Sequence, residues 1–161
     1  MNARQSKEIE QLYQQMYSKL FVYARSVLEN DALAEEAVQD TFHIACQKVD
    51  AVCGSPNPKG WLFNTLKYVI SNELRSRSIA KRILMDYFAL NINDISISND
   101  HIGLEIIYTD IADTEEFKLL KEMALEGKSH LEMAQARGIT VSACRKRVQR
   151  AKDFLQKKIN K

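Results

Sequence analysis

The sequence predicts an all-α fold made of two small helical domains. Residues that favour helices dominate the first eighty positions, and the 161 residues include only five Gly and two Pro. Apolar residues recur at steps of three and four, and a tight turn separates two further helices near the C-terminus. We therefore expect a first domain over residues 1–90, an acidic linker over 91–112 and a second domain over 113–161.

The first domain is expected to open with two amphipathic helices. One runs from about Lys7 to Glu29 and the other from about Ala32 to Val49, with Asn30-Asp31 as the break and cap between them. Residues 50–60 hold both prolines and two of the five glycines, which predicts a loop. In the second helix, Glu36 and Gln39 are expected to face outward.

A third helix is expected to begin near Pro58, with Asn57 as its N-cap. Its core face is predicted to consist of Trp61, Leu62, Thr65, Leu66, Val69 and Leu74, although Trp61 would also suit a stacking surface. Cations beside aromatics, next to an irregular loop, are the groups that a single-strand binder needs. The candidate residues for such binding are Lys59, Trp61, Asn64, Lys67, Tyr68, Asn72 and Arg75, and Arg77 is also expected to be exposed.

Residues 81–112 carry two bases and five acids. Ile79, Ile83, Leu84, Tyr87 and Phe88 can extend the third helix, while residues 91–100 are rich in Asn, Asp, Ser and Ile. The stretch is interpreted as an acidic linker with a role of its own or as a plain tether.

The last part of the chain predicts a helix-turn-helix. Ser129 and Glu132 have the spacing of a capping box at a helix start. Gly138 can adopt the left-handed conformation that ends this short helix, and Thr140 can cap the next one. A helix-turn-helix places its second helix in the major groove of DNA.

That second helix, expected over Val141–Ile159, has two contrasting faces. Val141, Cys144, Val148, Ala151 and Leu155 fall on one side at 100° per residue. The segment from Arg145 to Lys161 has eight Lys or Arg residues and one acid, Asp153, which suits phosphate and base contacts. The alternative is a solvated basic helix. The candidate DNA-binding residues are Thr140, Ser142, Arg145, Lys146, Arg147, Gln149 and Arg150.

The charge distribution and composition bear on the other classes of function that the chain could have. The net charge is 0 over residues 1–80, −3 over 81–112 and +5 over 113–161, so the positive charge is local to the last segment. Three cysteines without a CxxC spacing suggest a reduced, cytoplasmic protein, and three scattered histidines predict no metal site. No apolar run reaches the length of a membrane span. The sequence also lacks a phosphate-binding loop and a nucleophile elbow, so we expect neither an enzyme nor a bound cofactor.

Three segments together resemble a known family. Residues 31–42 (DALAEEAVQDTF), residues 57–63 (NPKGWLF) and residues 126–152 (from EGKSH to RAK) are similar, in this order, to the small two-domain sigma factors of bacterial RNA polymerase. The extracytoplasmic-function (ECF) type is the nearest. Lys67-Tyr68 stands where the family usually has Arg-Asn, so the chain resembles a divergent member.

The resemblance implies a division of labour. Residues 1–90 would correspond to sigma region 2, and residues 113–161 would correspond to region 4. Within region 2, Glu36 and Gln39 would contact the clamp of the polymerase largest subunit. The loop and helix over residues 50–75 would hold the single-stranded −10 element, while Arg145, Lys146, Gln149 and Arg150 would face bases of the −35 duplex. Thr140, Ser142 and Arg147 would lie nearer phosphates. Implied partners are core RNA polymerase through its clamp and flap, promoter DNA and an anti-sigma factor.

One alternative function is a stand-alone helix-turn-helix regulator whose N-terminal helices mediate dimerisation. Such a protein would bind palindromic sites with half-sites about 10 base pairs apart.

Overall fold

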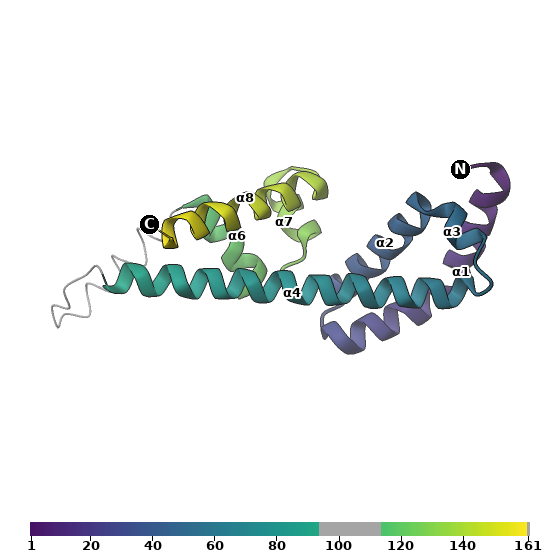
Figure 1. Cartoon of the computed structure of the whole chain (residues 1–161), viewed down its shortest axis with the longest axis horizontal. Coiled ribbons are helices and arrows are strands. Elements are labelled where there is room, and N and C mark those ends of the chain that lie inside the picture. Colours follow the sequence, from purple (N-terminus) through teal and green to yellow (C-terminus); the bar gives the residue numbers. More distant parts are fainter. Residues whose placement is uncertain (94–113, 161) are drawn as a thin grey trace. The chain divides into compact units, whose positions relative to one another are not determined.

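The computed structural model describes residues 1–93 and 114–160, and these residues form helices with no strand among them (Figure 1). The predicted all-α class is therefore confirmed. The helices, in chain order, are α1 (Ala3–Leu28), α2 (Asp31–Gln47), α3 (Val49–Cys53), α4 (Pro58–Asn93), α6 (Glu115–Ala124), α7 (His130–Arg137) and α8 (Val141–Ile159).

The chain divides into two compact units, Met1–Leu74 and Arg75–Lys161. The division falls within α4, earlier than the boundary at residue 90 that the composition suggested. Residues 91–93 complete α4, and the rest of the expected linker lies outside the described residues. Each unit has its own apolar core.

The N-terminal unit packs α1, α2, α3 and the first part of α4 around one core. Asn2 caps α1 by accepting a hydrogen bond from the Gln5 amide, and Asn30 caps α2 through the Leu33 amide at 2.9 Å. The buried residues of this core are Ile9, Met16, Leu20, Ala24, Ala34, Ala37, Val38, Phe42, Ala45, Val49, Val52, Leu62, Leu66 and Ile70.

The loop predicted over residues 50–60 is wrong in its first half, where the chain forms the short helix α3. Val49 and Val52 are buried in the core, and Gln5 of α1 donates a hydrogen bond of 2.6 Å to Asp50. These tertiary contacts outweigh the turn-forming composition of the segment, because a five-residue helix has little stability of its own. The irregular segment is left with residues 54–57.

The third predicted helix begins at Pro58 as expected, but one core assignment is wrong. Leu74 is 46% exposed, whereas Ile70 is buried beside Leu62 and Leu66. Each step of four residues rotates about 40° around a helix. By Leu74 this rotation has carried the apolar series away from the core of the N-terminal unit.

The C-terminal unit is built from the second part of α4 together with α6, α7 and α8. The extension of the third helix by Ile83, Leu84 and Tyr87 is confirmed, and these side chains are buried. The shared core consists of Ala80, Ile83, Leu84, Tyr87, Phe117, Leu119, Leu120, Met123, Met133, Ala134, Cys144, Val148, Ala151 and Leu155. The last three helices therefore rely on α4 for part of their core.

Candidate nucleic-acid interface

The turn between α7 and α8 is fixed by its backbone and caps. Ser129 accepts a hydrogen bond of 3.1 Å from the Glu132 amide at the start of α7. Gly138 ends α7 with φ 64°, a conformation that glycine adopts without a side-chain clash. Thr140 then accepts a hydrogen bond of 3.1 Å from the Ala143 amide and caps α8. The predicted N-caps at Ser129 and Thr140 and the left-handed Gly138 are confirmed, whereas only the Ser129 half of the expected capping box is formed.

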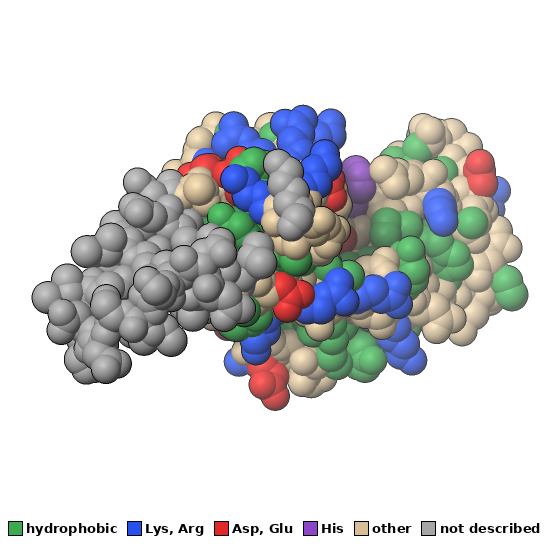
Figure 2. Space-filling model, turned by 60° about the vertical axis from the view of Figure 1, so that its left-hand side comes forward, with side chains coloured by type: hydrophobic (Ala, Val, Ile, Leu, Met, Phe, Trp, Pro, Cys, Tyr) green, Lys and Arg blue, Asp and Glu red, His purple; other side chains and the backbone are tan. Residues whose placement is uncertain are grey.

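Helix α8 buries one face and exposes the other, as the spacing predicted. Cys144, Val148, Ala151 and Leu155 are buried. The candidate DNA-binding residues are all exposed, and they are Thr140, Ser142, Arg145, Lys146, Arg147, Gln149 and Arg150. In Figure 2, Lys and Arg side chains gather along the upper edge of the C-terminal unit.

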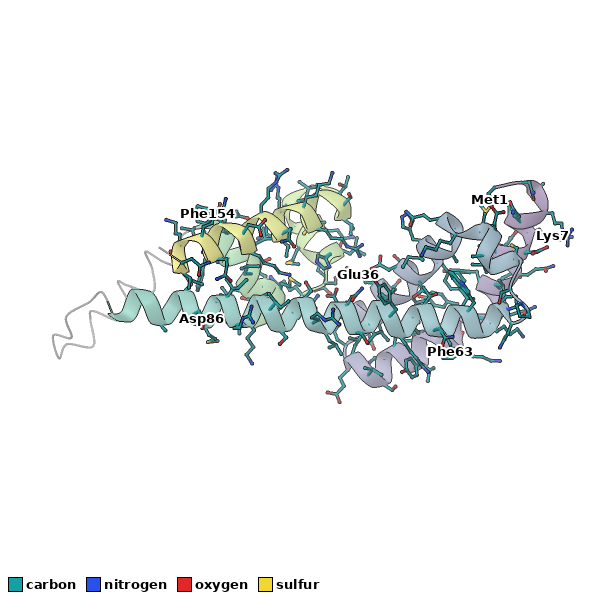
Figure 3. All side chains as sticks on the ribbon, in the orientation of Figure 1. Met1, Lys7, Glu36, Phe63, Asp86 and Phe154 are labelled. Carbon is teal, nitrogen blue, oxygen red and sulfur yellow. The ribbon has the colours of Figure 1, made fainter. Side chains whose placement is uncertain are left out.

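These candidates fall into a centre and two flanks. Ser142, Gln149 and Arg150 lie within about 60° of Lys146 around the helix, whereas Arg145 and Arg147 lie about 100° to either side. Gln149 donates a hydrogen bond of 3.2 Å to Asp153, one turn later, which restrains its side chain. Further along α8, Lys158 lies 5.0 Å from the ring centre of Phe154, which Figure 3 labels.

An ion-pair cluster joins the end of α7, just before the turn to α8, to helix α6. The sequence analysis did not predict this cluster. Arg137 pairs with Glu115 at 2.8 Å and with Glu122 at 2.9 Å. Its hydrogen bonds, first to Glu122 and then to Glu115, raise the pKa of Arg137 despite partial burial, which opposes the shift. The guanidinium therefore stays charged throughout the pH range in which proteins are handled.

A groove of about 250 Å³ lies between the start of α6 and the middle of α8. Glu115, Glu116 and Leu119 form one side, and Arg147, Arg150 and Ala151 form the other. Arg147 and Arg150 therefore have acidic residues on the α6 side of the helix. Glu115 and Glu116 thus mark the edge of the basic surface of α8 on the side of α6.

Sequence reasoning also missed the buried Lys152 and placed Arg77 wrongly. Arg77 of α4 was expected to be exposed, but it is half-buried and donates hydrogen bonds to two backbone carbonyls of its unit. Lys152 lies on the inner side of α8 and donates to Ser76. No sequence signal distinguished these cations from the exposed ones, because burial of a long side chain depends on which helix packs against it.

The candidate residues of α4 form a polar face, whose last residue, Arg75, is the first residue of the C-terminal unit. Asn64, Lys67, Tyr68, Asn72 and Arg75 are exposed, and Tyr68 is 64% exposed. Their spacing places them within about 80° of Asn64 around the helix. Trp61 is half-buried and packs against the core. Lys59 is exposed but lies about 140° from Asn64, so the structure does not bring it onto this face.

The start of α4 is held by Asn57. Its side-chain oxygen accepts a hydrogen bond of 3.0 Å from the Gly60 amide. A Cβ atom at Gly60 would lie 2.5 Å from the Asn57 side-chain nitrogen, so this glycine leaves room for the cap. The polar face of α4 thus begins next to a capped and defined turn.

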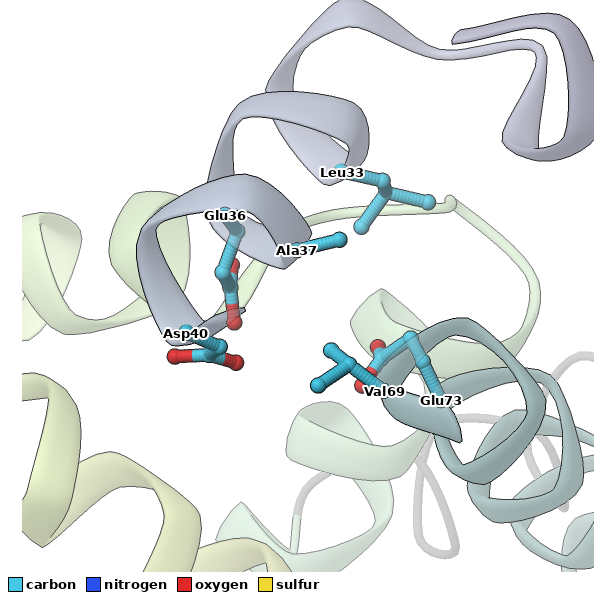
Figure 4. Close-up of a pocket in the computed structure, with 6 residues that line it drawn as sticks. All are labelled: Leu33, Glu36, Ala37, Asp40, Val69 and Glu73. Carbon is cyan, nitrogen blue, oxygen red and sulfur yellow. The ribbon is translucent and has the colours of Figure 1, made fainter. Parts of the chain in front are cut away.

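The two candidate polymerase contacts on α2 differ in exposure. Gln39 is exposed and donates a hydrogen bond of 3.4 Å to Glu35. Glu36, which was expected to face outward, is half-buried. It lines a small recess with Asp40 of α2 and with Val69 and Glu73 of α4 (Figure 4). Only part of its carboxylate surface is therefore open to a partner.

Two other features, a metal-binding cluster and a membrane-spanning helix, are not found among the described residues. Among residues 1–93 and 114–160, no group of three or more His, Cys, Asp or Glu is placed to hold a metal ion. None of the helices described combines the length and apolar character that a membrane crossing requires.

Comparison with known protein families gives one match. Residues 12–80 match the family model of sigma-70 region 2. This supports a sigma-70 family factor with a role in transcription initiation, and a region 2 domain implies interaction with core RNA polymerase and promoter DNA. No curated protein and no solved structure matches the chain.

The sigma-70 region 2 match covers most of α1, all of α2 and α3, and α4 as far as Ala80. It includes the exposed polar face of α4 and the candidate contacts on α2. Helices α6, α7 and α8 lie outside the matched residues, so their role depends on their geometry.

Proposed function

We propose that this protein is a sigma factor of the ECF type that binds core RNA polymerase and directs promoter-specific transcription initiation. The region 2 match over residues 12–80 supports the polymerase and promoter role. The arrangement of α7, a left-handed Gly138 and α8 suits a helix-turn-helix that corresponds to region 4. The protein would supply sequence preference, while the polymerase carries out the chemistry.

The observation that carries the DNA-reading role is the exposed cationic face of α8. Lys146, Gln149 and Arg150 lie opposite the buried stripe, immediately after a capped turn. Arg and Lys donate to guanine edges and Gln to adenine edges in the major groove. We assign base contacts in the −35 duplex to Arg145, Lys146, Gln149 and Arg150, and phosphate contacts to Thr140, Ser142 and Arg147.

We assign the single-stranded −10 element to the polar face of α4. Exposed Tyr68 offers a flat surface on which a base can stack, and Lys67 and Arg75 can hold the backbone. Asn64 and Asn72 supply hydrogen-bonding groups beside them. Lys59 would contribute only at the margin because of its position around the helix, and Trp61 because it is half-buried against the core.

Gln39 is our main candidate for the contact with the polymerase clamp, with the open part of Glu36 beside it. Both lie on α2, within the matched region. The flap would bind the C-terminal unit.

Transcription in vitro with core polymerase and genomic fragments tests the proposal. We expect start sites that share a pair of upstream elements and that require this protein. The variant Lys146→Gln/Arg150→Gln should lose discrimination at the upstream element. The matched control Lys81→Gln/Arg82→Gln removes the same charge from exposed positions of α4 and should retain it.

Two results would overturn the proposal. One is equal protection of promoter DNA with and without core polymerase. The other is a preference for palindromic sites in the absence of polymerase, which would identify a stand-alone dimeric regulator instead.

A further inference from the structure

The end of α6 and the start of α7 are both held by one arginine of α4. Arg77 donates from one terminal nitrogen to the carbonyl of Met123 at 2.5 Å and from the other to the carbonyl of Lys128 at 2.9 Å. Met123 lies in the last turn of α6, where carbonyls have no partner within the helix. A cation at this end also complements the helix dipole.

The second of these carbonyls lies next to the cap of α7. Lys128 precedes Ser129, whose buried hydroxyl accepts a hydrogen bond from the Glu132 amide in the first turn of α7. Between the two contacts, Gly127 is left-handed with φ 66°, and the Lys128 amide returns to the Glu122 carbonyl at 3.0 Å. Arg77 thus bridges both ends of the α6–α7 connection.

The residue before Arg77 contacts α8 itself. The Ser76 hydroxyl accepts a hydrogen bond of 2.6 Å from Lys152, which lies on the inner side of α8. Over the next three turns of α4, Ala80, Ile83, Leu84 and Tyr87 join the same core as the buried stripe of α8. The second part of α4 therefore touches α8 and the connection that orients α7.

We propose that Arg77 is a positioning residue for DNA reading, and that the segment from Arg75 to Asn93 is a structural part of the DNA-reading unit. This inference rests on the proposed function of α8. Arg77 acts through α6 and α7, since its guanidinium is half-buried and donates to one carbonyl at each end of their connection. Loss of the bridge would leave α8 folded but less firmly oriented.

A lysine cannot replace this bridge. The guanidinium presents its donors in a rigid planar fork, whereas an ammonium is a single charged point on a flexible stem. Arg77→Lys keeps the charge and reaches at most one carbonyl at a time in good geometry. The variant separates the effect of charge from the effect of bridging.

The test uses the full-length chain with core polymerase and two templates, a promoter mapped by transcription and a copy with its upstream element scrambled. The ratio of transcription from the two measures upstream reading. We expect Arg77→Gln to lower this ratio by about five- to tenfold, since a charge-assisted hydrogen bond is worth about one decade in an equilibrium constant. Arg77→Lys should lower it less, and the matched control Arg82→Gln should leave it unchanged.

Amide hydrogen exchange of the free full-length chain gives a second readout, independent of DNA. Arg77→Gln should speed exchange over Glu126–Met133, while α1 in the other unit stays protected. An unchanged ratio, an equal loss in Arg82→Gln, or unchanged exchange over Glu126–Met133 would overturn the proposal. If the wild-type protein itself ignores the upstream element, the proposed function of α8 fails, and the exchange result still decides the role of Arg77.

Discussion

Lys152 of α8 donates a hydrogen bond of 2.6 Å to the hydroxyl of Ser76 on α4. Lys152 is only 8% exposed, although it lies in the most cationic helix of the described chain. Its methylene stem is buried among apolar side chains while its amine finds a polar partner, which is the usual way in which lysine is accommodated in a core. One cation of α8 is thus structural, whereas those on the opposite face remain open.

Lys152→Ala should lower the free energy of unfolding by about 1–3 kcal/mol, because both the packing of the stem and the hydrogen bond are lost. Ser76→Ala should cost less, since only the hydroxyl is removed. Urea unfolding of the two variants measures this. Lys157→Ala, at an exposed position of the same helix, is the control and should be close to neutral.

Gly138→Ala should destabilise the protein by about 1 kcal/mol, because a Cβ atom is strained at a φ of 64°. Space is not the obstacle, since nothing lies within 4 Å of a Cβ placed there. Gly138→Asn should cost less, because asparagine tolerates the left-handed conformation. Thermal or urea unfolding compares the two. Equal losses in both variants would contradict the backbone explanation.

Arg137→Met should destabilise the C-terminal unit by about 1–3 kcal/mol, since the half-buried Glu122 loses its nearest cation and the exposed Glu115 loses an ion pair. A double-mutant cycle with Glu122→Gln isolates the pair. The pKa of Arg137 is raised in the folded state by its hydrogen bonds to Glu122 and Glu115, so its contribution is complete at any pH below the ordinary pKa of arginine. The destabilisation should therefore be the same at pH 7 and pH 10. A smaller loss at pH 10 would argue against the ion pairs as its source.

Cys53 should react with iodoacetamide more slowly than Cys46 at neutral pH. Burial, followed by a hydrogen bond to Glu8, raises the pKa of Cys53 and so lowers the fraction of reactive thiolate. Cys46 is exposed. Mass spectrometry of the alkylated peptides gives both rates. Glu8→Gln removes the anion that opposes ionisation, so it should speed alkylation of Cys53 and leave that of Cys46 unchanged.

Tyr68→Ala should leave the stability within about 0.5 kcal/mol, as expected for an exposed side chain. If Tyr68 stacks on a base of the −10 element, transcription from a duplex promoter should fall several-fold. A template with that element already unpaired should restore part of the activity, because the melting cost is removed. Tyr68→Phe keeps the ring and should behave like the wild type. An equal defect on both templates would place Tyr68 outside the melting step.

Local chemistry was sufficient to predict much of the secondary structure. The caps at Asn30, Ser129 and Thr140 and the left-handed Gly138 each depend on a few neighbouring atoms, so the residue type alone specifies them. The burial of Cys144, Val148, Ala151 and Leu155 also followed from helical spacing. By contrast, α3 escaped prediction because contacts from α1, distant in sequence, stabilise it.

The roles of Arg77, Arg137 and Lys152 escaped prediction for a related reason. Each looked like one more surface cation, and each instead has partners on another helix of its unit. The positions of these three residues in the sequence do not indicate which residues they contact. The charge of a residue can be read from the sequence, but its burial depends on the helix that packs against it.

The sequence by itself determined α1, α2, α7 and α8, the turn before α8 and the cationic face that follows it, because caps, glycine and periodicity act over a few residues. Only the tertiary structure decided that the second part of α4 belongs to the core of α6, α7 and α8. Burial of apolar surface is non-directional. An amphipathic stripe therefore indicates that its apolar face will be buried, but it does not indicate which helix will cover that face. That choice separates Lys152, which is buried and bonded to α4, from the exposed cations on the opposite face of α8.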